Sequence, residues 1–274
     1  MAVLFSIITV CFNSAKTIRQ TFDSVLQQQC KDYEYIVVDG ASTDGTVDII
    51  KEYEPKFEGR MRWISEPDDG IYYAMNKGIK LSKGEYLNFL NADDYYEPDA
   101  LEFIQREIVA HPGFDVYYGI VRCYDEDGEV CLSRESHIRL PYRRICHQAM
   151  WYRHDVFVSF GEYDTRFRMC ADFHHQIGLL RKNYSFLPID HIVVNYSNNG
   201  FSSYNKGGDI LRKEDREIFF EYGYLKKREY LQQVRAEKRH ERYVAVKIFL
   251  HRILLVKYIK PRLQTMYKHC FKIR

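Results

Sequence analysis

Several common signatures are missing from this chain of 274 residues. None of its seven cysteines is spaced C-x-x-C, so a structural zinc site or disulfide framework is not expected. We expect the protein to be located in a reducing cytoplasm. The first apolar segment lacks a basic leader and a small-residue cleavage site, so we expect no secretory signal peptide. The sequence also lacks G-x-G-x-x-G after its first apolar run and any G-x-x-x-x-G-K-[ST] loop, which argues against a dinucleotide cofactor or a phosphate-binding glycine loop.

Acidic residues are missing from the C-terminal end of the chain, where none follows Glu241. The totals of 40 Lys and Arg and 38 Asp and Glu give a formal net charge of only +2. However, the first 210 residues hold 22 basic and 31 acidic residues, a balance of −9, and the remainder hold 18 and 7, a balance of +11. The chain is therefore predicted to have an acidic body and a basic tail.

The first 112 residues alternate between short apolar runs and segments with helical spacing. Strands are predicted over residues 4–12, 35–38, 61–65 and 86–90, and helices over 17–29, 44–53 and 71–81, with another after Pro98. Alternation at this pitch is typical of an α/β fold in which helices cover both faces of a mostly parallel central sheet.

After residue 113 the pattern changes. Residues 115–124 and 129–132 predict a β-hairpin, residues 171–182 a helix, and residues 186–196 a further strand. From residue 209 onward only helical patterns occur. We therefore predict an α/β domain over residues 1–208, made of halves 1–112 and 113–208, and a basic helical tail over residues 209–274.

Acidic residues follow three of the first four predicted strands, among them Asp39, Asp68 and the pair Asp93 and Asp94. Ligands bind outside the carboxyl ends of parallel strands, so these side chains should meet at one edge of the sheet. Clustered carboxylates repel one another unless a cation or a proton lies among them. Mg²⁺ or Mn²⁺ bound to Asp oxygens and to substrate phosphates would supply this charge. The alternative is an Asp-rich turn before the helix at Pro98.

Five segments, at residues 6–13, 37–46, 65–72, 74–78 and 90–94, together resemble glycosyltransferase family 2. The resemblance extends over residues 3–205, and the stretch 66–78 is most similar to transferases of bacterial exopolysaccharide or lipopolysaccharide assembly. It implies the Rossmann-like GT-A fold and a nucleotide-sugar donor, with a UDP-sugar expected. It further implies inverting transfer to a hydroxyl group of a glycan or lipid-linked acceptor in surface polysaccharide synthesis.

The resemblance also implies roles for individual residues. The nucleotide would be bound by Thr9, Asn13, Asp39, Asp68 and Asn91, with Thr9 and Asp39 at the base. Asp93 would bind Mg²⁺ or Mn²⁺ as part of the family's D-x-D signature, and Asp94 would support the metal or the start of the helix. Asn91 stands where this signature has its first Asp. Because an amide cannot neutralise a cation, we expect Asn91 to contact the ribose or to lie outside the ligand shell.

Asp172 matches the position at which family members carry the carboxylate that deprotonates the acceptor, although Ala171 replaces the usual Glu. A sugar hydroxyl is a poor nucleophile until its proton is removed, so a base is required. A helix N-terminus lowers the pKa of an Asp placed there, and the alternative role for Asp172 is helix capping. His147 and Gln148 stand where relatives contact the acceptor or the diphosphate.

Two other functions are kept as alternatives. A sugar-1-phosphate nucleotidylyltransferase should have a glycine-rich basic loop after its first strand, and residues 11–16 contain no glycine. A catalytically silent, membrane-associated scaffold should not bind a nucleotide. No recognised nucleic-acid-binding module occurs in the chain, so nucleic acid is not expected as a partner.

The basic tail contains a mostly apolar segment, residues 243–259, which includes Lys247, Arg252 and Lys257. This segment is too short and too charged to span a membrane comfortably. Because anionic lipid attracts basic segments, we expect residues 242–274 to bind the inner face of the cell membrane peripherally. The alternative is a helix packed on the body or on a second copy in a homodimer.

Overall fold

The computed structural model describes residues 3–125, 128–198, 204–229, 231–232 and 239. The chain forms two compact units, residues 1–218 and 219–274, and helix α7 (Tyr204–Glu221) contains the boundary between them. The division expected near residue 208 stays a prediction. The tail segments at 243–259 and 242–274 lie outside the described residues.

The described part of the first unit is built on one nine-stranded sheet with the strand order β3-β2-β1-β4-β8-β6-β9-β5, and β7 pairs with β6. The strands are β1 (Phe5–Cys11), β2 (Tyr33–Asp39), β3 (Met61–Ser65), β4 (Tyr86–Phe89), β5 (Tyr95–Tyr96), β6 (Val116–Asp125), β7 (Gly128–Ser133), β8 (Met150–Arg153) and β9 (Phe186–Ser197). Strands β1 to β4 pair in parallel, as expected from the alternating pattern, and so do β6 and β9. The β4–β8, β6–β8, β6–β7 and β5–β9 pairs are antiparallel, so the complete sheet is mixed.

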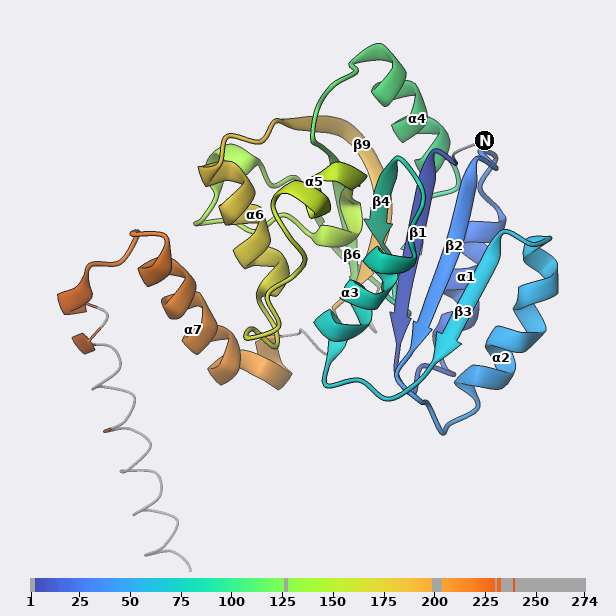
Figure 1. Ribbon diagram of the computed structural model, residues 1–274, viewed down its shortest axis with the longest axis horizontal. Helices are drawn as coiled ribbons and strands as arrows, with labels where there is room; N and C mark the ends of the chain where they lie inside the picture. Colours follow the sequence, from blue (N-terminus) through green and yellow to red (C-terminus); the bar gives the residue numbers. More distant parts are fainter. Residues whose placement is uncertain (1–2, 126–127, 199–203, 230, 233–238, 240–274) are drawn as a thin grey trace, which may run out of the picture. The chain divides into compact units, whose positions relative to one another are not determined.

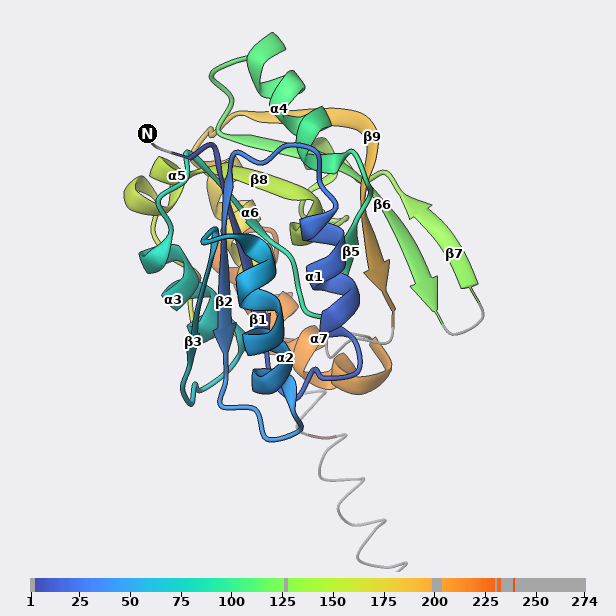
Figure 2. The same cartoon turned by 90° about the vertical axis from the view of Figure 1, so that its right-hand side faces the viewer.

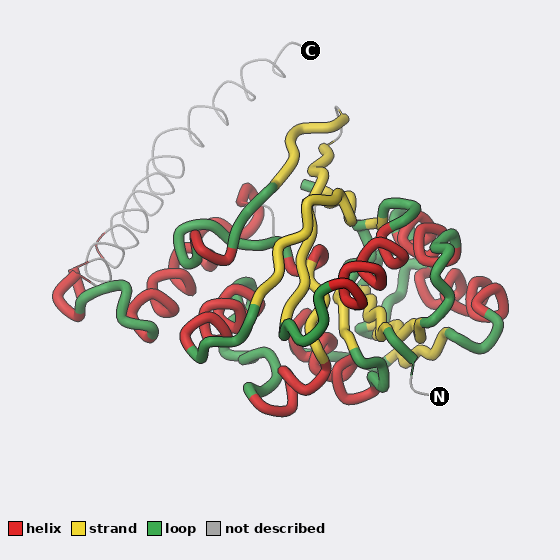
Figure 3. Tube along the Cα trace, turned by 90° about the horizontal axis from the view of Figure 1, so that it is seen from above, coloured by secondary structure: helices red, strands yellow, loops and turns green. Residues whose placement is uncertain are grey.

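Helices cover both faces of this sheet. They are α1 (Ile18–Leu26), α2 (Thr46–Tyr53), α3 (Ile71–Leu81), α4 (Ala100–Ala110), α5 (His154–Ser159) and α6 (Ala171–Arg181), with short 3₁₀ helices η1 (Glu54–Phe57), η2 (His137–Arg139) and η3 (His147–Ala149). Figures 1 and 2 place α1 and α2 on one face of the sheet and α3 and α6 on the other. Seen from above in Figure 3, the strands lie between helices on either side.

The sheet separates two sets of buried side chains because successive residues of a strand point to opposite faces. On β1, Phe5 and Ile7 belong to the hydrophobic cluster that includes Phe22 of α1. Ile8 faces the other way and meets α3, where a Cβ atom added to Gly78 would lie only 2.4 Å from Ile8 Cγ2. Glycine at this position therefore lets α3 approach the sheet closely.

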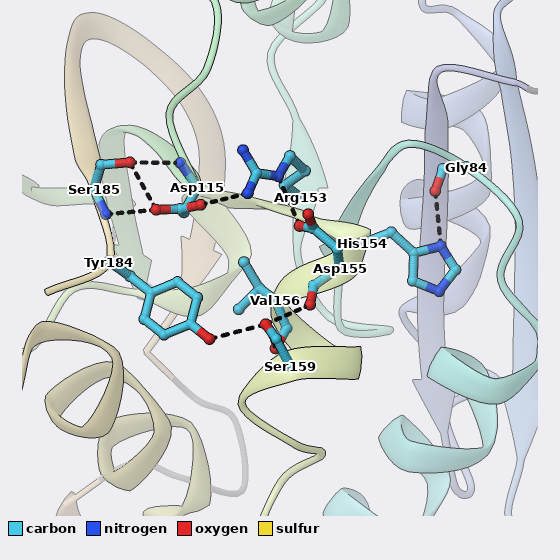
Figure 4. Close-up of polar contacts among 9 residues, drawn as sticks. All are labelled: Gly84, Asp115, Arg153, His154, Asp155, Val156, Ser159, Tyr184 and Ser185. Atoms are coloured by element: carbon cyan, nitrogen blue, oxygen red, sulfur yellow. Dashed lines mark hydrogen bonds and ion pairs between the residues drawn. The ribbon is translucent and has the colours of Figure 1, made fainter. Parts of the chain in front are cut away.

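Strand β8 and helix α5, which the sequence pattern does not reveal, are held in place by polar contacts (Figure 4). Arg153 Nη2 lies 2.8 Å from Asp115 Oδ1, and the other oxygen of this carboxylate accepts 2.7 Å hydrogen bonds from the backbone N–H and hydroxyl of Ser185. His154 Nδ1 lies 3.0 Å from the carbonyl oxygen of Gly84. These contacts join β8 to the starts of β6, β9 and β4, and so fix η3, which immediately precedes β8.

Several predicted boundaries agree closely with the structure. The strand at residues 61–65 and the helix at residues 71–81 coincide with β3 and α3, and the predicted hairpin corresponds to β6 and β7. The helix near residues 171–182 corresponds to α6. Across the part of the chain that the structure describes, no helix combines the length and apolar character needed to span a bilayer.

Candidate active site

Asp39 ends β2 with a completely buried carboxylate that its neighbours hold in one orientation. Its Oδ2 accepts hydrogen bonds from the backbone N–H of Ser42 at 2.9 Å and from the hydroxyl of Ser65 at 2.6 Å, while the Ser42 hydroxyl donates to Oδ1. Asn13, with φ of 51°, accepts a 2.9 Å hydrogen bond from the backbone N–H of Thr43. The loops after β1 and β2 are therefore tied together by hydrogen bonds.

Asp68 comes from the loop after β3 and lies against the same strand end. A Cβ atom added to Gly40 would be 2.9 Å from Asp68 Oδ2, so glycine makes room for this carboxylate. Thr9 is placed differently, because it lies within β1 rather than at or after a strand end, and it is fully buried. Its hydroxyl donates to the carbonyl oxygen of Leu90 at 2.7 Å and lies 2.8 Å from the hydroxyl of Tyr35. The structure thus brings together the loops that carry Asn13, Asp39 and Asp68, whereas Thr9 lies within β1 and Asn91 lies in the loop after β4.

Asp94 anchors the loop after β4 to two distant segments. It is 1% exposed, and its two carboxylate oxygens accept hydrogen bonds from the side-chain amide of Gln148 at 2.7 Å and the backbone N–H of Ser197 at 2.9 Å. Burial, followed by repulsion from Asp93, raises the pKa of Asp94 well above its ordinary value. Both oxygens of Asp94 thus accept hydrogen bonds from the protein, and Asp94 is buried. The neighbouring Asp93 is half-buried.

The loop after β4 offers oxygen ligands suited to a hard cation. Asn91 Oδ1 is buried and accepts no hydrogen bond from the protein, and the carboxylate of Asp93 is two residues away. In the described residues no three His, Cys, Asp or Glu side chains come together as a metal-binding group. Mg²⁺ commonly uses only one or two protein carboxylates and takes its other ligands from substrate phosphates and water. The residues present therefore fit a cation shared with a diphosphate.

Asp172 lies in the first turn of α6, and two side chains from other elements hold its carboxylate. The hydroxyl of Tyr72, on α3, donates to Oδ1 at 2.6 Å, and Nδ1 of His147, on η3, lies 3.0 Å from Oδ2. Burial on its own would raise the pKa of Asp172, but His147, Tyr72 and Arg144 outweigh burial and lower the pKa to about 2. Asp172 is therefore ionised at neutral pH.

The position of Asp172 differs from that of a helix cap. The N-cap residue of α6 is Cys170, and the Asp172 side chain bonds to Tyr72 and His147 rather than to backbone N–H groups of its own helix. The alternative explanation of Asp172 as a capping residue is therefore not what the structure shows. Its side chain is 18% exposed, so Asp172 is not completely enclosed by the protein.

His147 and Gln148 join the two parts of the site. His147 contacts Asp172, and the adjacent Gln148 donates to Asp94, so one dipeptide connects the predicted base to the predicted metal loop. Nε2 of His147 is buried and has no hydrogen-bond partner in the protein. The structure therefore brings together Asp172, His147, Gln148 and Asp94 from three separate segments.

Tyr72 is a site residue to which sequence reasoning gave no role. It is 100 positions away from Asp172 in the chain, so no local pattern links the two. The available signal was its place in the segment at residues 65–72, two positions after Gly70. Gly70 precedes α3 with φ of 139°, a conformation that glycine adopts readily, and this turn delivers Tyr72 to the site.

The fold is that of the GT-A glycosyltransferases. It is similar, with a TM-score of 0.62, to the mannosyltransferase PcManGT from Pyrobaculum calidifontis in complex with GDP-Man and Mn²⁺, at 17% identity over 83% of this chain and 66% of that one. The TarS 1–349 fragment from S. aureus in complex with UDP gives a TM-score of 0.60 at 20% identity, over 80% of this chain and 70% of that one.

Sequence comparison identifies the family. Residues 6–168 match the model of glycosyl transferase family 2. Over 210 residues the chain is 35% identical to the PGL/p-HBAD biosynthesis glycosyltransferase of Mycobacterium tuberculosis. The aligned residues make up 76% of this chain and 79% of that protein. The chain belongs to glycosyl transferase family 2.

Proposed function

We propose that this glycosyltransferase moves a sugar from a nucleotide diphosphate donor, a UDP-sugar, to a hydroxyl group of a glycan or lipid-linked acceptor. The main support is Asp172, whose carboxylate is ionised and whose side chain is 18% exposed. His147 and Gln148 connect this residue to the loop that contains Asp93. The reaction needs a base for the acceptor proton and a group that stabilises the leaving diphosphate, on opposite sides of the anomeric carbon.

The reaction is an inverting single displacement. The acceptor oxygen forms a bond to the anomeric carbon from the face opposite the diphosphate, and the bond from this carbon to the diphosphate oxygen breaks. Asp172 takes the proton of the acceptor hydroxyl. A carboxylate with a pKa of about 2 is a weak base toward an unreacted hydroxyl, so the proton moves late, after bond formation has made the hydroxyl acidic. Tyr72 and His147 orient this carboxylate for the transfer.

A divalent cation, Mg²⁺ or Mn²⁺, is proposed at Asp93 with Asn91 beside it. When bound, the cation would stabilise the negative charge that develops on the leaving diphosphate. The unpaired Asn91 oxygen supports this assignment, as does the Mn²⁺ present with PcManGT. Asp94 supports the loop through Gln148 and Ser197 rather than offering a vacant oxygen.

The nucleotide is proposed to lie over the loops after β1, β2 and β3, where Asn13, Asp39 and Asp68 meet. Both oxygens of Asp39 already accept hydrogen bonds, so a base N–H would share one of them. Complexes of TarS with UDP and with UDP-GlcNAc support a uridine nucleotide in this fold. Direct binding by Thr9 stays a prediction, because its hydroxyl is engaged within the sheet.

Replacement of Asp172 by Asn tests the base assignment. We expect Asp172→Asn to lower turnover by about 10²–10⁴-fold, since it removes the proton acceptor. Affinity for UDP in the presence of Mn²⁺, measured by titration calorimetry, should change little because Asp172 lies outside the nucleotide loops. Asp155→Asn, an exposed aspartate on α5, is the matched control. Equal turnover of the wild type and the Asp172→Asn variant would exclude Asp172 as the base.

The products separate the proposed activity from its alternatives. A glycosyltransferase releases the nucleoside diphosphate, whereas a sugar-1-phosphate nucleotidylyltransferase exchanges pyrophosphate. A silent scaffold should bind neither UDP nor a UDP-sugar. Screening hydrolysis of several nucleotide sugars with the full chain would also identify the donor.

The place of action is proposed to be the cytoplasmic face of the cell membrane, with residues 242–274 binding anionic lipid. The support is the charge distribution, because 18 basic and 7 acidic residues follow residue 210. Lys and Arg near an anionic surface each contribute about 1 kcal/mol of attraction. Packing of this segment against a second copy, in a homodimer, is the competing proposal.

A further inference from the structure

A cavity lies beside helix α1 and strands β5, β6 and β9. It has a volume of about 510 Å³, and its lining includes Gln20 of α1, Gln27 at the C-terminal end of α1, Tyr95 of β5, Arg122 and Tyr124 of β6, and Asn195 of β9. This volume is within the range of about 300–1,000 Å³ that is usual for small-molecule sites. None of the predicted donor, metal or base residues lines it.

Neither Asp172 nor the side chains that hold it, Tyr72 and His147, line this cavity. Tyr96, another lining residue, belongs to the hydrophobic cluster on the α1 side and stacks on Trp151. Figures 1 and 2 show α1 on the face opposite α3 and α6, the helices that carry Tyr72 and Asp172.

One wall of the cavity is aromatic. The rings of Tyr95 and Tyr124 are stacked, with centroids 6.4 Å apart and an angle of 27° between their planes, and both side chains are half-buried. Tyrosine combines an apolar ring with a polar hydroxyl, so it suits a ligand that has both apolar C–H faces and hydroxyl groups.

A buried acceptor without a partner lines the same cavity. Asn195 is 3% exposed, and its Nδ2 donates to Glu97 Oε1 at 3.1 Å, while its Oδ1 accepts no hydrogen bond from the protein. Buried polar atoms in folded proteins are nearly always paired, so an unpaired one calls for an explanation. A ligand that donates a hydrogen bond to Asn195 Oδ1 would provide it.

The charges of the cavity disfavour an anionic ligand. Among its described lining residues Arg122 carries the only positive charge, and Nη1 of Arg122 lies 2.5 Å from Glu97 Oε1. Asp23 adds a further negative charge. The remaining polar groups include the amides of Gln20 and Gln27, which both donate and accept hydrogen bonds. An uncharged polyhydroxylated ligand matches this combination, whereas a phosphate does not.

We propose that this cavity binds a pyranose unit of a glycan, at a site separate from the site of sugar transfer. The sugar ring packs against the Tyr95–Tyr124 wall, and one of its hydroxyl groups donates to Asn195 Oδ1. The amides at the α1 rim bind further hydroxyls. This binding requires neither a nucleotide nor the transfer reaction, so it can be tested independently of the proposed activity.

Saturation-transfer NMR on the full chain tests the proposal with methyl glycosides of mannose, galactose, rhamnose and N-acetylglucosamine as probes. We expect at least one probe to bind in the millimolar range and to stay bound when UDP and Mn²⁺ are added. Tyr95→Ala should lower its affinity about fivefold to tenfold, because the stacking surface is lost. Gln20→Ala, at an exposed position of α1, should also weaken binding without disturbing the fold.

Tyr184→Ala is the control, since Tyr184 is likewise half-buried but bonds to Ser159 outside the cavity (Figure 4). This variant should bind the probe like the wild type. The proposal is overturned if no probe binds, if UDP displaces the bound probe, or if Tyr184→Ala weakens binding as much as Tyr95→Ala does. Unchanged affinity in both Tyr95→Ala and Gln20→Ala would also overturn it.

Discussion

Asp93 and Asp94 are adjacent in the sequence but have different surroundings. Asp94 is buried and uses both oxygens to hold Gln148 and Ser197, whereas Asp93 is only half-buried. The resemblance to the family predicts Asp93 as the metal ligand and Asp94 as a support, but the sequence does not show which groups bind the oxygens of Asp94. The distinction arises from residues 54 and 103 positions away from Asp94, which the fold brings to its two oxygens.

Asp93→Ala should remove the stimulation of activity by Mg²⁺ or Mn²⁺ and weaken nucleotide binding. Loss of the Lewis acid should lower turnover by about 10²–10³-fold. The measurement is turnover as a function of metal concentration, combined with UDP titration calorimetry. Asp99→Ala, at an exposed aspartate six positions later, should behave like the wild type. Unchanged metal dependence in Asp93→Ala would refute the metal assignment.

Tyr72→Phe removes the hydroxyl that donates to Asp172 at 2.6 Å and leaves the ring in place. A hydrogen bond to a charged group contributes about 1.5–3 kcal/mol, so we expect kcat to fall by about tenfold or more. UDP affinity should stay constant. Tyr73→Phe is the control on the neighbouring residue, which is 41% exposed. A fall in UDP affinity without a change in kcat would contradict a role for Tyr72 in positioning the carboxylate.

At the scale of helices and strands, the elements that could be predicted are those whose sequences have a clear local periodicity. The strand at residues 61–65 and the helix at 71–81 have clear periodicity, and both match the structure. Strand β8 has four residues and β5 has two, so neither provides enough positions to establish alternation. Both are strands because of their partners: β8 lies between β4 and β6, and β5 pairs with β9.

The contact between Asp172 and His147 shows the same limit for the site. Asp172 was expected to deprotonate the acceptor, and His147 was expected to contact the acceptor or the diphosphate. Their 3.0 Å contact depends on how the fold places η3 against α6, because the two residues are 25 positions apart in the chain. That placement follows from the polar contacts of β8 and from packing of α6, neither of which has a local sequence pattern. Residue types and strand-end positions could be inferred from the sequence, and side-chain partners could not.

Helix α6 carries a buried histidine that should make stability depend on pH. His175 is 1% exposed and lies parallel to the ring of Phe157 at 5.0 Å, and its Nε2 lies 3.1 Å from the carbonyl oxygen of Gly161. Burial, as the largest cause, lowers the pKa of His175 to about 4. Because an unfolded chain has a His pKa of about 6.5, the unfolded state takes up the proton first as the pH falls.

The contribution of His175 is therefore fully present above about pH 6.5 and is lost as the pH falls toward about 4. The difference amounts to about 3 kcal/mol of unfolding free energy over this window. His175→Phe should flatten the dependence between these two pH values, measured by urea unfolding at several pH values. His111→Phe, at an exposed histidine, should leave the slope unchanged. An unchanged slope in His175→Phe would mean that other groups cause the pH dependence.

At the scale of the whole molecule, charge divides the chain into an acidic body and a basic end. We expect the full chain to co-sediment with vesicles that contain phosphatidylglycerol and not with pure phosphatidylcholine vesicles. A chain that ends at Glu241 should lose this binding, since each Lys or Arg near the surface contributes about 1 kcal/mol. Added salt should weaken it because surface charges are screened. Equal binding of the long and short chains would reject the membrane role.

The β5–β9 pair also bears on the order in which the molecule is made. Tyr95 pairs with Asn195, so β5 has to wait for a partner about 100 residues later in synthesis. At about 5–20 residues per second, the ribosome needs roughly 5–20 s to cover that distance. Strands β1 to β4 pair with one another and need no later segment to do so. The backbone N–H of Ser197, however, holds Asp94. A nascent chain can therefore pair four of the nine described strands well before the loop that carries Asp93 takes its final form.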